Sequence, residues 1–205
     1  MSKTLAILGA GELGKQIANL AIADYHYDKI LFYDDFNTGN LICGNSSNLI
    51  HDFNDKKFNE LIIGIGYNFL KERQEKFKLF CDKIPFGIII HSSAWVDSTA
   101  TINKGCVIYP RTTIDKNVII HSNVIINLNC VIAHDSVVHS HTFLSPGVNV
   151  AGFVTIGECC NIGISTTIID NINIVDNTQT GGGTVVIKDI TNPGLYVGNT
   201  AKFIR

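Results

Sequence analysis

An aliphatic residue recurs at every sixth position through the C-terminal half of the chain. The run has fourteen successive members: Val96, Ile102, Ile108, Ile114, Ile120, Ile126, Ile132, Val138, Leu144, Val150, Ile156, Ile162, Ile168 and Ile174. Neither the 3.6-residue period of a helix nor strict alternation explains this spacing. A six-residue period is typical of a parallel β-helix, in which each hexapeptide forms one side of a triangular coil. The aliphatic residues are predicted to point inward and to stack from coil to coil.

Two further positions of the repeat agree with this fold. Small residues mostly follow each aliphatic residue by four positions, and they are also predicted to point inward: Ala100, Cys106, Thr112, Val118, Val124, Cys130, Ser136, Thr142, Val148, Val154, Cys160 and Thr166. Types that tolerate tight turns often follow by three positions, where the coil needs a corner: Gly105, Asn117, Asn123, Asn129, Asp135, Gly147, Asn171 and Asn177. Cysteines at inward positions are interpreted as core thiols.

The first part of the chain has a different pattern, in which short apolar runs alternate with segments of helical period. Strands are expected at 4–10, 29–35, 60–66 and 86–90, and helices at 12–25 and 68–83. This order predicts an α/β domain with a small parallel sheet. The fold class is therefore α/β plus all-β. We place a Rossmann-like domain at 1–88 and the β-helix, with a C-terminal tail, at 89–205.

Composition excludes several classes of function. The net charge is -2, and no basic stripe of the kind that binds a nucleic-acid polymer is present. No apolar run approaches the roughly 18 residues that a membrane span requires, and the N-terminal residues lack the pattern of a signal peptide. We expect a cytoplasmic protein. The six cysteines show no CxxC pair and do not suggest a disulfide framework.

Histidines gather between 134 and 141, but the six-residue register separates them. His139 follows His121 by one coil, so these two should stack, and no third ligand continues their column. A metal site is therefore disfavoured, and His139 and His141 are interpreted as residues of the outside or the corners. His134 is followed by Asp135, and a neighbouring carboxylate can fix the tautomer of a general base. A solvated edge residue remains the alternative for His134.

The first loop matches a phosphate-binding fingerprint. Gly9, Gly11 and Gly14 follow a strand and open a helix, and Asp34 lies twenty residues beyond Gly14. Alone, this pattern indicates an NAD-dependent enzyme. Fewer than 90 residues precede the β-helix, however, which gives one mononucleotide-binding half. We therefore favour a UDP-linked ligand, with its pyrophosphate at the helix N-terminus.

Several segments resemble one group of the hexapeptide-repeat acyltransferases. They are "GAGELG" at 9–14, "FYDDFNTG" at 32–39, "IGIGYN" at 63–68, "NCVIAHDSVV" at 129–138, "SPGVNVAG" at 145–152 and the C-terminal "GGGTVVIKDI…YVGNTAKFIR". The group comprises the UDP-4-amino-sugar N-acetyltransferases of bacillosamine synthesis and the related sialic-acid O-acetyltransferases. The resemblance implies a left-handed β-helix, a homotrimer, and acetyl-CoA bound between neighbouring prisms.

The resemblance also implies roles for individual residues. His134 would be the catalytic base and Asp135 its supporting acid. The implied cofactor-binding residues are Asn127, Phe143, Gly152, Gly163, Ile164, Gly182 and Lys188. The implied substrate-binding residues are Gly9, Gly11, Gly14, Asp34, Asp35, Gly64, Gly66, Tyr67 and Asn68. No metal is implied.

This chain departs from the family at two places. Phe143 stands where relatives often have a histidine near the acetyl group, and the first loop reads Glu12-Leu13 where relatives usually have Gly-His. Four hypotheses follow: an N-acetyltransferase acting on a nucleotide-linked amino sugar, a sialic-acid-type O-acetyltransferase, an NAD-binding enzyme, or a non-catalytic trimeric scaffold.

Overall fold

The computed structural model describes residues 3–205. Within this range the chain divides into two compact units, of which the first ends at Ile89 and the second spans Ile90–Arg205. Each unit has its own hydrophobic core. The two units are therefore described separately.

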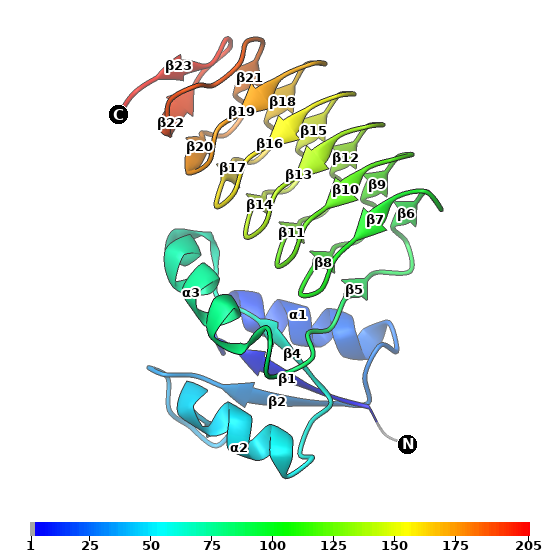
Figure 1. Cartoon of the computed structure of the whole chain (residues 1–205), viewed down its shortest axis with the longest axis vertical. Coiled ribbons are helices and arrows are strands. Elements are labelled where there is room, and N and C mark those ends of the chain that lie inside the picture. Colours follow the sequence, from blue (N-terminus) through cyan, green and yellow to red (C-terminus); the bar gives the residue numbers. More distant parts are fainter. Residues whose placement is uncertain (1–2) are drawn as a thin grey trace. The chain divides into compact units, whose positions relative to one another are not determined.

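The first unit is a parallel sheet with strand order β3-β2-β1-β4 (Figure 1). The strands are β1 (Thr4–Leu8), β2 (Lys29–Tyr33), β3 (Ile42–Gly44) and β4 (Glu60–Ile63). The helices are α1 (Glu12–Ala23), α2 (Leu49–Asn54) and α3 (Leu70–Phe80), with 3-10 turns η1 (Ser46–Asn48) and η2 (Tyr67–Phe69). The chain leaves β1 toward β2 and later returns to the other side of β1 as β4. In an open parallel sheet, ligands bind at the carboxyl ends of the strands beside such a switch point.

Sequence patterns account for most of this unit, with two exceptions. The sequence analysis missed β3 and α2, which are too short to show a clear period. It also expected a strand over 86–90, and this prediction is confirmed only at Ile89–Ile90. Only a single bridge joins Phe86 to Leu61, and β5 (Ile89–Ile90) pairs instead in a sheet of the β-helix. From a short apolar run in the sequence, neither the strand that it will pair with nor the sheet that it will join can be predicted.

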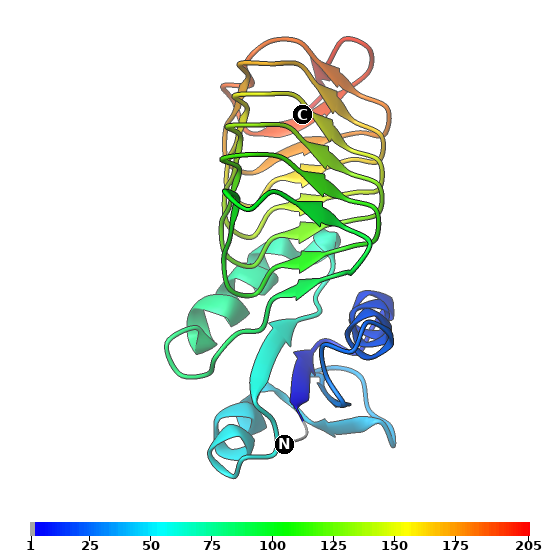
Figure 2. The same ribbon diagram turned by 90° about the vertical axis from the view of Figure 1, so that its right-hand side faces the viewer.

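Within residues 89–205, strands of mostly two residues stack into three sheets, parallel except for the last strand pair, that form the sides of a prism (Figure 2). One sheet contains β7 (Thr101–Ile102), β10 (Ile119–Ile120), β13 (Val137–Val138), β16 (Thr155–Ile156) and β19 (Asn173–Ile174). A second contains β6 (Trp95–Val96), β9 (Thr113–Ile114), β12 (Val131–Ile132), β15 (Asn149–Val150), β18 (Thr167–Ile168) and β21 (Val185–Val186). The third contains β5, β8 (Val107–Ile108), β11 (Ile125–Ile126), β14 (Phe143–Leu144), β17 (Asn161–Ile162), β20 (Thr178–Thr180), β22 (Gly194–Val197) and β23 (Lys202–Phe203).

The predicted register of the prism is confirmed. Each residue pairs with the one 18 positions later, as Ile120 does with Val138 and Val138 with Ile156. The aliphatic series is buried from Ile108 to Ile174, and the inward cysteines Cys106, Cys130 and Cys160 are buried with it. The interior of the prism is therefore a continuous aliphatic stack.

The corners recur at six-residue intervals and adopt the left-handed conformation. Positive φ angles occur at Gly105, Arg111, Asn117, Asn123, Asn129, Asp135, His141, Gly147, Phe153, Cys159, Ser165, Asn171, Asn177 and Gly183. Asparagine and glycine accept this region readily, whereas Arg111 and Phe153 are less suited to it. The coil register therefore imposes the corner conformation even on unfavourable residue types.

The tail departs from the 18-residue register, because β22 pairs with β20 at a spacing of 16 residues, and it then folds back through an antiparallel pair of β22 and β23. None of the helices described in residues 3–205 is both long and apolar enough to cross a membrane.

Candidate active site

His134 and Asp135 form a bonded pair at one edge of the prism, directly after β12. The Nδ1 atom of His134 lies 2.9 Å from Oδ2 of Asp135. The other carboxylate oxygen, Oδ1, accepts a hydrogen bond of 2.9 Å from the Asn117 side chain, one coil earlier. Hydrogen bonds from Asn117, then from His134, lower the pKa of Asp135, so the carboxylate stays ionised at neutral pH.

This geometry assigns the two ring nitrogens of His134 different roles. The carboxylate accepts the proton on Nδ1, so the neutral ring presents a lone pair at Nε2. Within residues 3–205, Nε2 makes no hydrogen bond, and 41% of the side chain is exposed. The pair is therefore arranged as a general base that is open to an incoming ligand.

Two residues of the following coil position the His134 ring. Phe153 packs edge-to-face on it, with ring centroids 5.2 Å apart. Gly152 lies beside the ring, and a Cβ atom built at this glycine would lie 2.6 Å from Cε1 and 2.9 Å from Nε2. The resemblance assigned Gly152 to the cofactor. In the structure, the absence of a side chain at Gly152 also leaves room for the His134 ring.

Most of the other implied cofactor residues lie at a different edge of the prism. Asn127 follows β11, and Gly163 occupies the same place in the coil two turns later, after β17. Ile164 and Gly182 stack beside them, since a Cβ at Gly182 would lie 3.0 Å from Ile164. One side of the coil, about six extended residues or roughly 20 Å, separates this edge from His134. A single prism does not bring these residues to the base.

Two implied cofactor residues have other environments. Phe143 is buried in β14, between Ile125 and Asn161 of the neighbouring strands. Lys188 is exposed and falls in the same coil position as His134, three turns later.

The remaining histidines of the prism do not contribute to this pair. His121 and His139 stack as predicted, with ring centroids 4.8 Å apart and an interplanar angle of 7°. Desolvation, and then the nearby His139, lower the pKa of His121. The interpretation of His141 requires a correction. It occupies a corner, but its side chain is only 3% exposed, and its Nδ1 lies 2.9 Å from Nδ2 of buried Asn123.

In the first unit, the glycines of the fingerprint allow close backbone packing. A Cβ at Gly14 would lie 1.9 Å from the carbonyl oxygen of Gly9, and one at Gly64 would lie 2.9 Å from Cα of Gly14. Gly9 also has φ +110°. By contrast, Gly11 and Gly66 precede α1 and η2 and have open space around them. Gly11 therefore leaves the N-terminus of α1 accessible to an anion.

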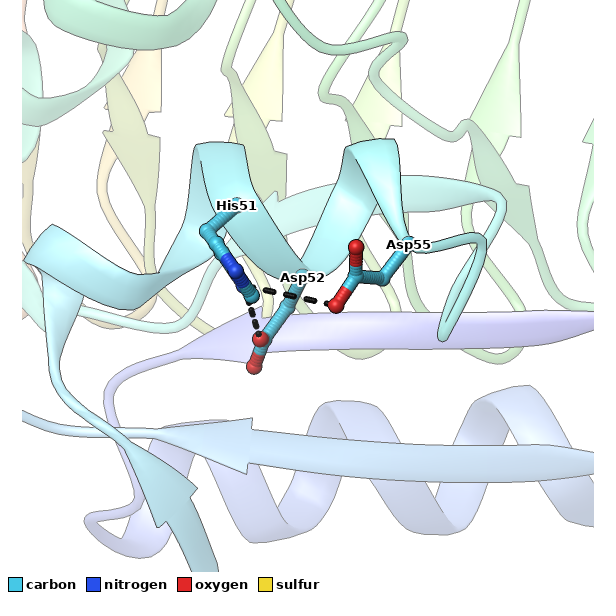
Figure 3. A group of neighbouring side chains, drawn as sticks. All are labelled: His51, Asp52 and Asp55. Carbon is cyan, nitrogen blue, oxygen red and sulfur yellow. Dashed lines mark hydrogen bonds and ion pairs between the residues drawn. The ribbon is translucent and has the colours of Figure 1, made fainter.

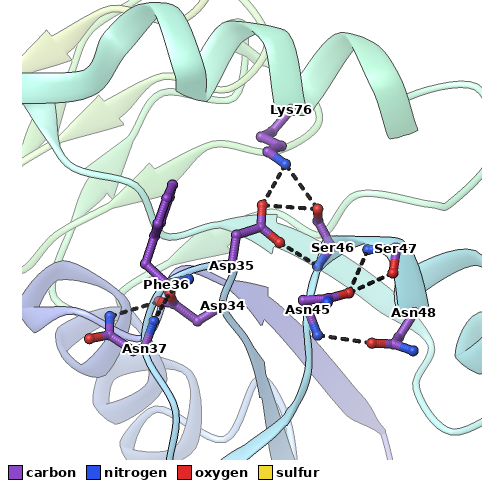
Figure 4. Close-up of polar contacts among 9 residues, drawn as sticks. All are labelled: Asp34, Asp35, Phe36, Asn37, Asn45, Ser46, Ser47, Asn48 and Lys76. Atoms are coloured by element: carbon purple, nitrogen blue, oxygen red, sulfur yellow. Dashed lines mark hydrogen bonds and ion pairs between the residues drawn. The ribbon is translucent and has the colours of Figure 1, made fainter.

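The carboxylate of Asp34 holds the loop after β2 in place (Figure 4). It accepts hydrogen bonds from the backbone N–H groups of Ala10, Phe36 and Asn37, at 2.7, 2.9 and 2.8 Å. Burial alone would raise the pKa of Asp34, but these donors outweigh it and lower the pKa to about 2. Asp34 thus joins the glycine loop to the end of β2.

This pKa shift predicts a specific loss of stability in acid. Because the folded-state pKa lies below the unfolded value, Asp34 stabilises the fold fully above pH 4, and this contribution disappears as pH falls toward 2. We expect Asp34→Ala to cost about 2 kcal/mol at pH 7, with a smaller difference from wild type at pH 3. Urea unfolding of both proteins across this range measures the effect. A difference that does not change with pH would contradict it.

Asp35 has different partners. Its Oδ1 atom accepts from the Ser46 backbone at 2.7 Å, and its Oδ2 accepts from the Ser46 hydroxyl at 2.9 Å and from Lys76 at 2.6 Å. Lys76 also donates to the Ser46 hydroxyl at 2.9 Å. Figure 4 shows Lys76 reaching from α3 to this pair. Asp35 therefore joins α3 to the segment before α2.

A cavity of about 320 Å³ opens beside these acids. Its lining residues come from the carboxyl ends of β1, β2 and β4 and from η2 and α3: Leu8, Gly9, Asp34, Asp35, Phe36, Ile65, Phe69, Glu72 and Lys76. Sequence reasoning found the glycine and the acids but missed Phe36, Phe69, Glu72 and Lys76. Tyr67 and Asn68, which the resemblance implied, lie in η2 but outside this lining.

A second polar cluster lies on α2. His51 Nδ1 is 3.3 Å from Asp52 and 3.4 Å from Asp55 (Figure 3). Asp52 also accepts from Lys57 at 2.7 Å and from the Tyr33 hydroxyl at 2.8 Å. The Lys57 ammonium already neutralises the most buried carboxylate. We interpret the cluster as an ion-pair network that attaches α2 to β2.

Comparisons with known proteins agree with both units. A model of the PglD N-terminal domain family matches residues 4–76. A UDP-3-O-acylglucosamine N-acyltransferase from Bordetella pertussis is 36% identical over 61 residues. That match covers 30% of this chain and 17% of the relative, so it spans about a sixth of the length of this curated relative.

Solved structures resemble the whole chain. The acetyltransferase domain of PglB from Neisseria gonorrhoeae has 25% identity and a TM-score of 0.91, over 98% of this chain and 100% of that one. The same domain has been solved in complex with acetyl coenzyme A. The fold also matches the GDP-perosamine N-acetyltransferase PerB of Caulobacter crescentus, with 22% identity, a TM-score of 0.88, and coverage of 98% and 97%. The fold class is therefore a small α/β domain followed by a left-handed β-helix, as in these acetyltransferase structures, and residues 4–76 match the PglD N-terminal domain family.

Proposed function

We propose that this protein transfers the acetyl group of acetyl-CoA to the amine of a nucleotide-linked amino sugar, with His134 as general base. The observation that carries the proposal is the His134–Asp135 pair, whose Nε2 is open at the prism edge. The acetyl-CoA complex of the Neisseria domain supports the choice of acyl donor.

The reaction needs no covalent enzyme intermediate, because the thioester is already activated. The sugar amine enters as the free base and attacks the acetyl carbon. The N–C bond forms as Nε2 of His134 accepts the amine proton, which gives a tetrahedral oxyanion, and the C–S bond breaks when this oxyanion collapses. Coenzyme A leaves as a thiolate and is then protonated. Asp135 stabilises the imidazolium that forms, since its carboxylate faces Nδ1 at 2.9 Å.

The backbone near the base offers a donor for the developing oxyanion. The N–H of Gly152 makes no hydrogen bond within residues 3–205, and Gly152 lies against the His134 ring. We propose that this N–H binds the oxyanion of the tetrahedral state. Holding the amine and the thioester in contact would supply a further part of the rate.

A homotrimer would complete the donor site. Asn127, Gly163, Ile164 and Gly182 lie one side of the coil away from His134, so a neighbouring copy would have to present them to the base. The same surface has exposed apolar side chains at Leu128, Val131, Ile164, Ile169 and Ile187, which a neighbouring prism would cover. We propose that acetyl-CoA lies between two prisms, with Phe143 near its acetyl end and Lys188 near its phosphates.

The first unit is proposed to bind the nucleotide. The open N-terminus of α1 at Gly11 suits a pyrophosphate, and the cavity beside Asp35 suits a base. The resemblance favours a UDP-4-amino-4,6-dideoxy-N-acetylglucosamine of bacillosamine synthesis and a cytoplasmic site of action. The Caulobacter neighbour is named for a GDP-linked amino sugar.

Thiol release from acetyl-CoA tests the proposal, with a panel of UDP- and GDP-linked 4-amino sugars and with sialic acid as acceptors. We expect release with an amino sugar and a product heavier by one acetyl group, identified by mass. Release only with sialic acid would favour the O-acetyltransferase alternative. Release with none, together with NAD binding, would favour the dinucleotide enzyme, and release with none without NAD binding would favour the scaffold.

A further inference from the structure

The cavity of the first unit has the size and walls of a nucleobase pocket. Its volume of about 320 Å³ is small for a whole nucleotide sugar but sufficient for one flat base. Phe36 and Phe69 line it, and these two residues are 94% and 57% exposed, so their side chains are available for stacking. Leu8 and Ile65 complete the apolar part of the wall.

Two of the four charged residues in the wall come from one face of α3, and the other two, Asp34 and Asp35, already accept hydrogen bonds from neighbouring residues. Glu72 and Lys76 are four residues apart on this helix, and both line the cavity. The Glu72 side chain makes no hydrogen bond or ion pair with another residue of 3–205, and the neighbouring Lys76 bonds to Asp35 and Ser46. Glu72 therefore offers the cavity a carboxylate with both oxygens available.

Lys76 offers the cavity one donor. An ammonium has three N–H groups, of which two are directed at Oδ2 of Asp35 and Oγ of Ser46. These partners also hold the side chain, which is 28% exposed, in a defined position. The wall therefore offers two acceptors, the carboxylate oxygens of Glu72, and one N–H donor from Lys76, which lies one turn further along α3.

Only one common base has the complementary edge. Guanine offers two adjacent donors, N1–H and N2–H, followed by the O6 acceptor, so a carboxylate can bind it through two parallel hydrogen bonds. Uracil has a single N3–H between two carbonyl oxygens, which a carboxylate would repel. Adenine and cytosine each present one amino group beside a ring acceptor. We infer that Glu72 and Lys76 select guanine, so the sugar substrate is linked to GDP.

This inference rests on the proposed function, because it assumes that the cavity binds the nucleotide of the sugar donor. It replaces the uridine nucleotide implied by the sequence resemblance. Glu72 is then a specificity-determining residue that contacts the base far from the reacting amine.

Calorimetry of the wild-type protein with GDP, IDP and UDP tests the inference. IDP lacks the N2 amino group and so loses one of the two bonds to the carboxylate. We expect GDP to bind at least tenfold more tightly than IDP or UDP. Glu72→Gln should weaken GDP binding about tenfold or more and leave UDP binding nearly unchanged. Glu75→Gln is the matched control, since Glu75 lies on the same helix outside the lining, and it should bind GDP as wild type does.

The outcomes separate this inference from the proposed function. Tighter binding of UDP than GDP, or wild-type GDP affinity in Glu72→Gln, would overturn the selection of guanine. Acetylation of a UDP-linked amino sugar in the thiol-release assay would then still support acetyl transfer to a nucleotide-linked amino sugar. Binding of neither nucleotide would overturn both the selection and the nucleotide-binding role of the first unit.

Discussion

His134→Ala is expected to lower the acetylation rate by about 100-fold or more, because a positioned general base typically contributes 10²- to 10⁴-fold. The loss should appear mainly in kcat, since no cofactor-binding role of the His134 side chain enters the proposed mechanism. Acetyl-CoA binding, measured by calorimetry, should stay close to that of wild type. The side chain is partly exposed and outside the aliphatic core, so the melting temperature should change little.

Two further variants make this prediction specific. Asp135→Asn retains the size of the acid but removes the charge that faces Nδ1, and we expect a smaller loss than in His134→Ala. His139→Ala is the matched control, because His139 stacks on His121 and has no part in the proposed mechanism. It should retain wild-type turnover. Near wild-type turnover of His134→Ala would remove this histidine from the mechanism.

The prism was predictable from sequence in more detail than the first unit. A six-residue repeat determines the sheet, the inward face and the corner of each residue at once, and stacking of identical coils propagates any register. The corners at Arg111 and Phe153 follow this register although their residue types disfavour it. In the first unit, β3 and α2 are short and are stabilised by long-range contacts such as Tyr33 with Asp52. The local periodicity of a sequence does not reveal such long-range contacts.

The same contrast applies to the candidate sites. Adjacency in sequence was enough to predict the His134–Asp135 contact. The burial of His141 was not predictable, because the register gives the direction of a side chain but not what covers it, and here Asn123 is its hydrogen-bonding neighbour. The lining of the cavity in the first unit comes from several elements without a shared motif. Phe36, Phe69 and Glu72 gave no signal that sequence analysis could have used.

Gly152→Ala is expected to reduce turnover by one to two orders of magnitude while the fold stays intact. The new Cβ would lie 2.6 Å from Cε1 and 2.9 Å from Nε2 of His134, closer than such contacts occur in proteins. The atoms in its way belong to a side chain that is 41% exposed and can rotate away. A shift of about 1 Å in a catalytic group can cost 100-fold in rate. Steady-state kinetics and thermal melting of the variant measure the two effects separately.

A double-mutant cycle decides whether the loss acts through the base. If Gly152→Ala only displaces the His134 ring, then His134→Ala already contains most of its effect, and adding Gly152→Ala should change the rate little further. If the alanine instead disturbs the backbone N–H that binds the oxyanion, the two losses should multiply. Turnover near wild type in Gly152→Ala would show that the ring position in the structure is not the one that reacts. A large fall in melting temperature would show that the glycine serves the coil rather than the base.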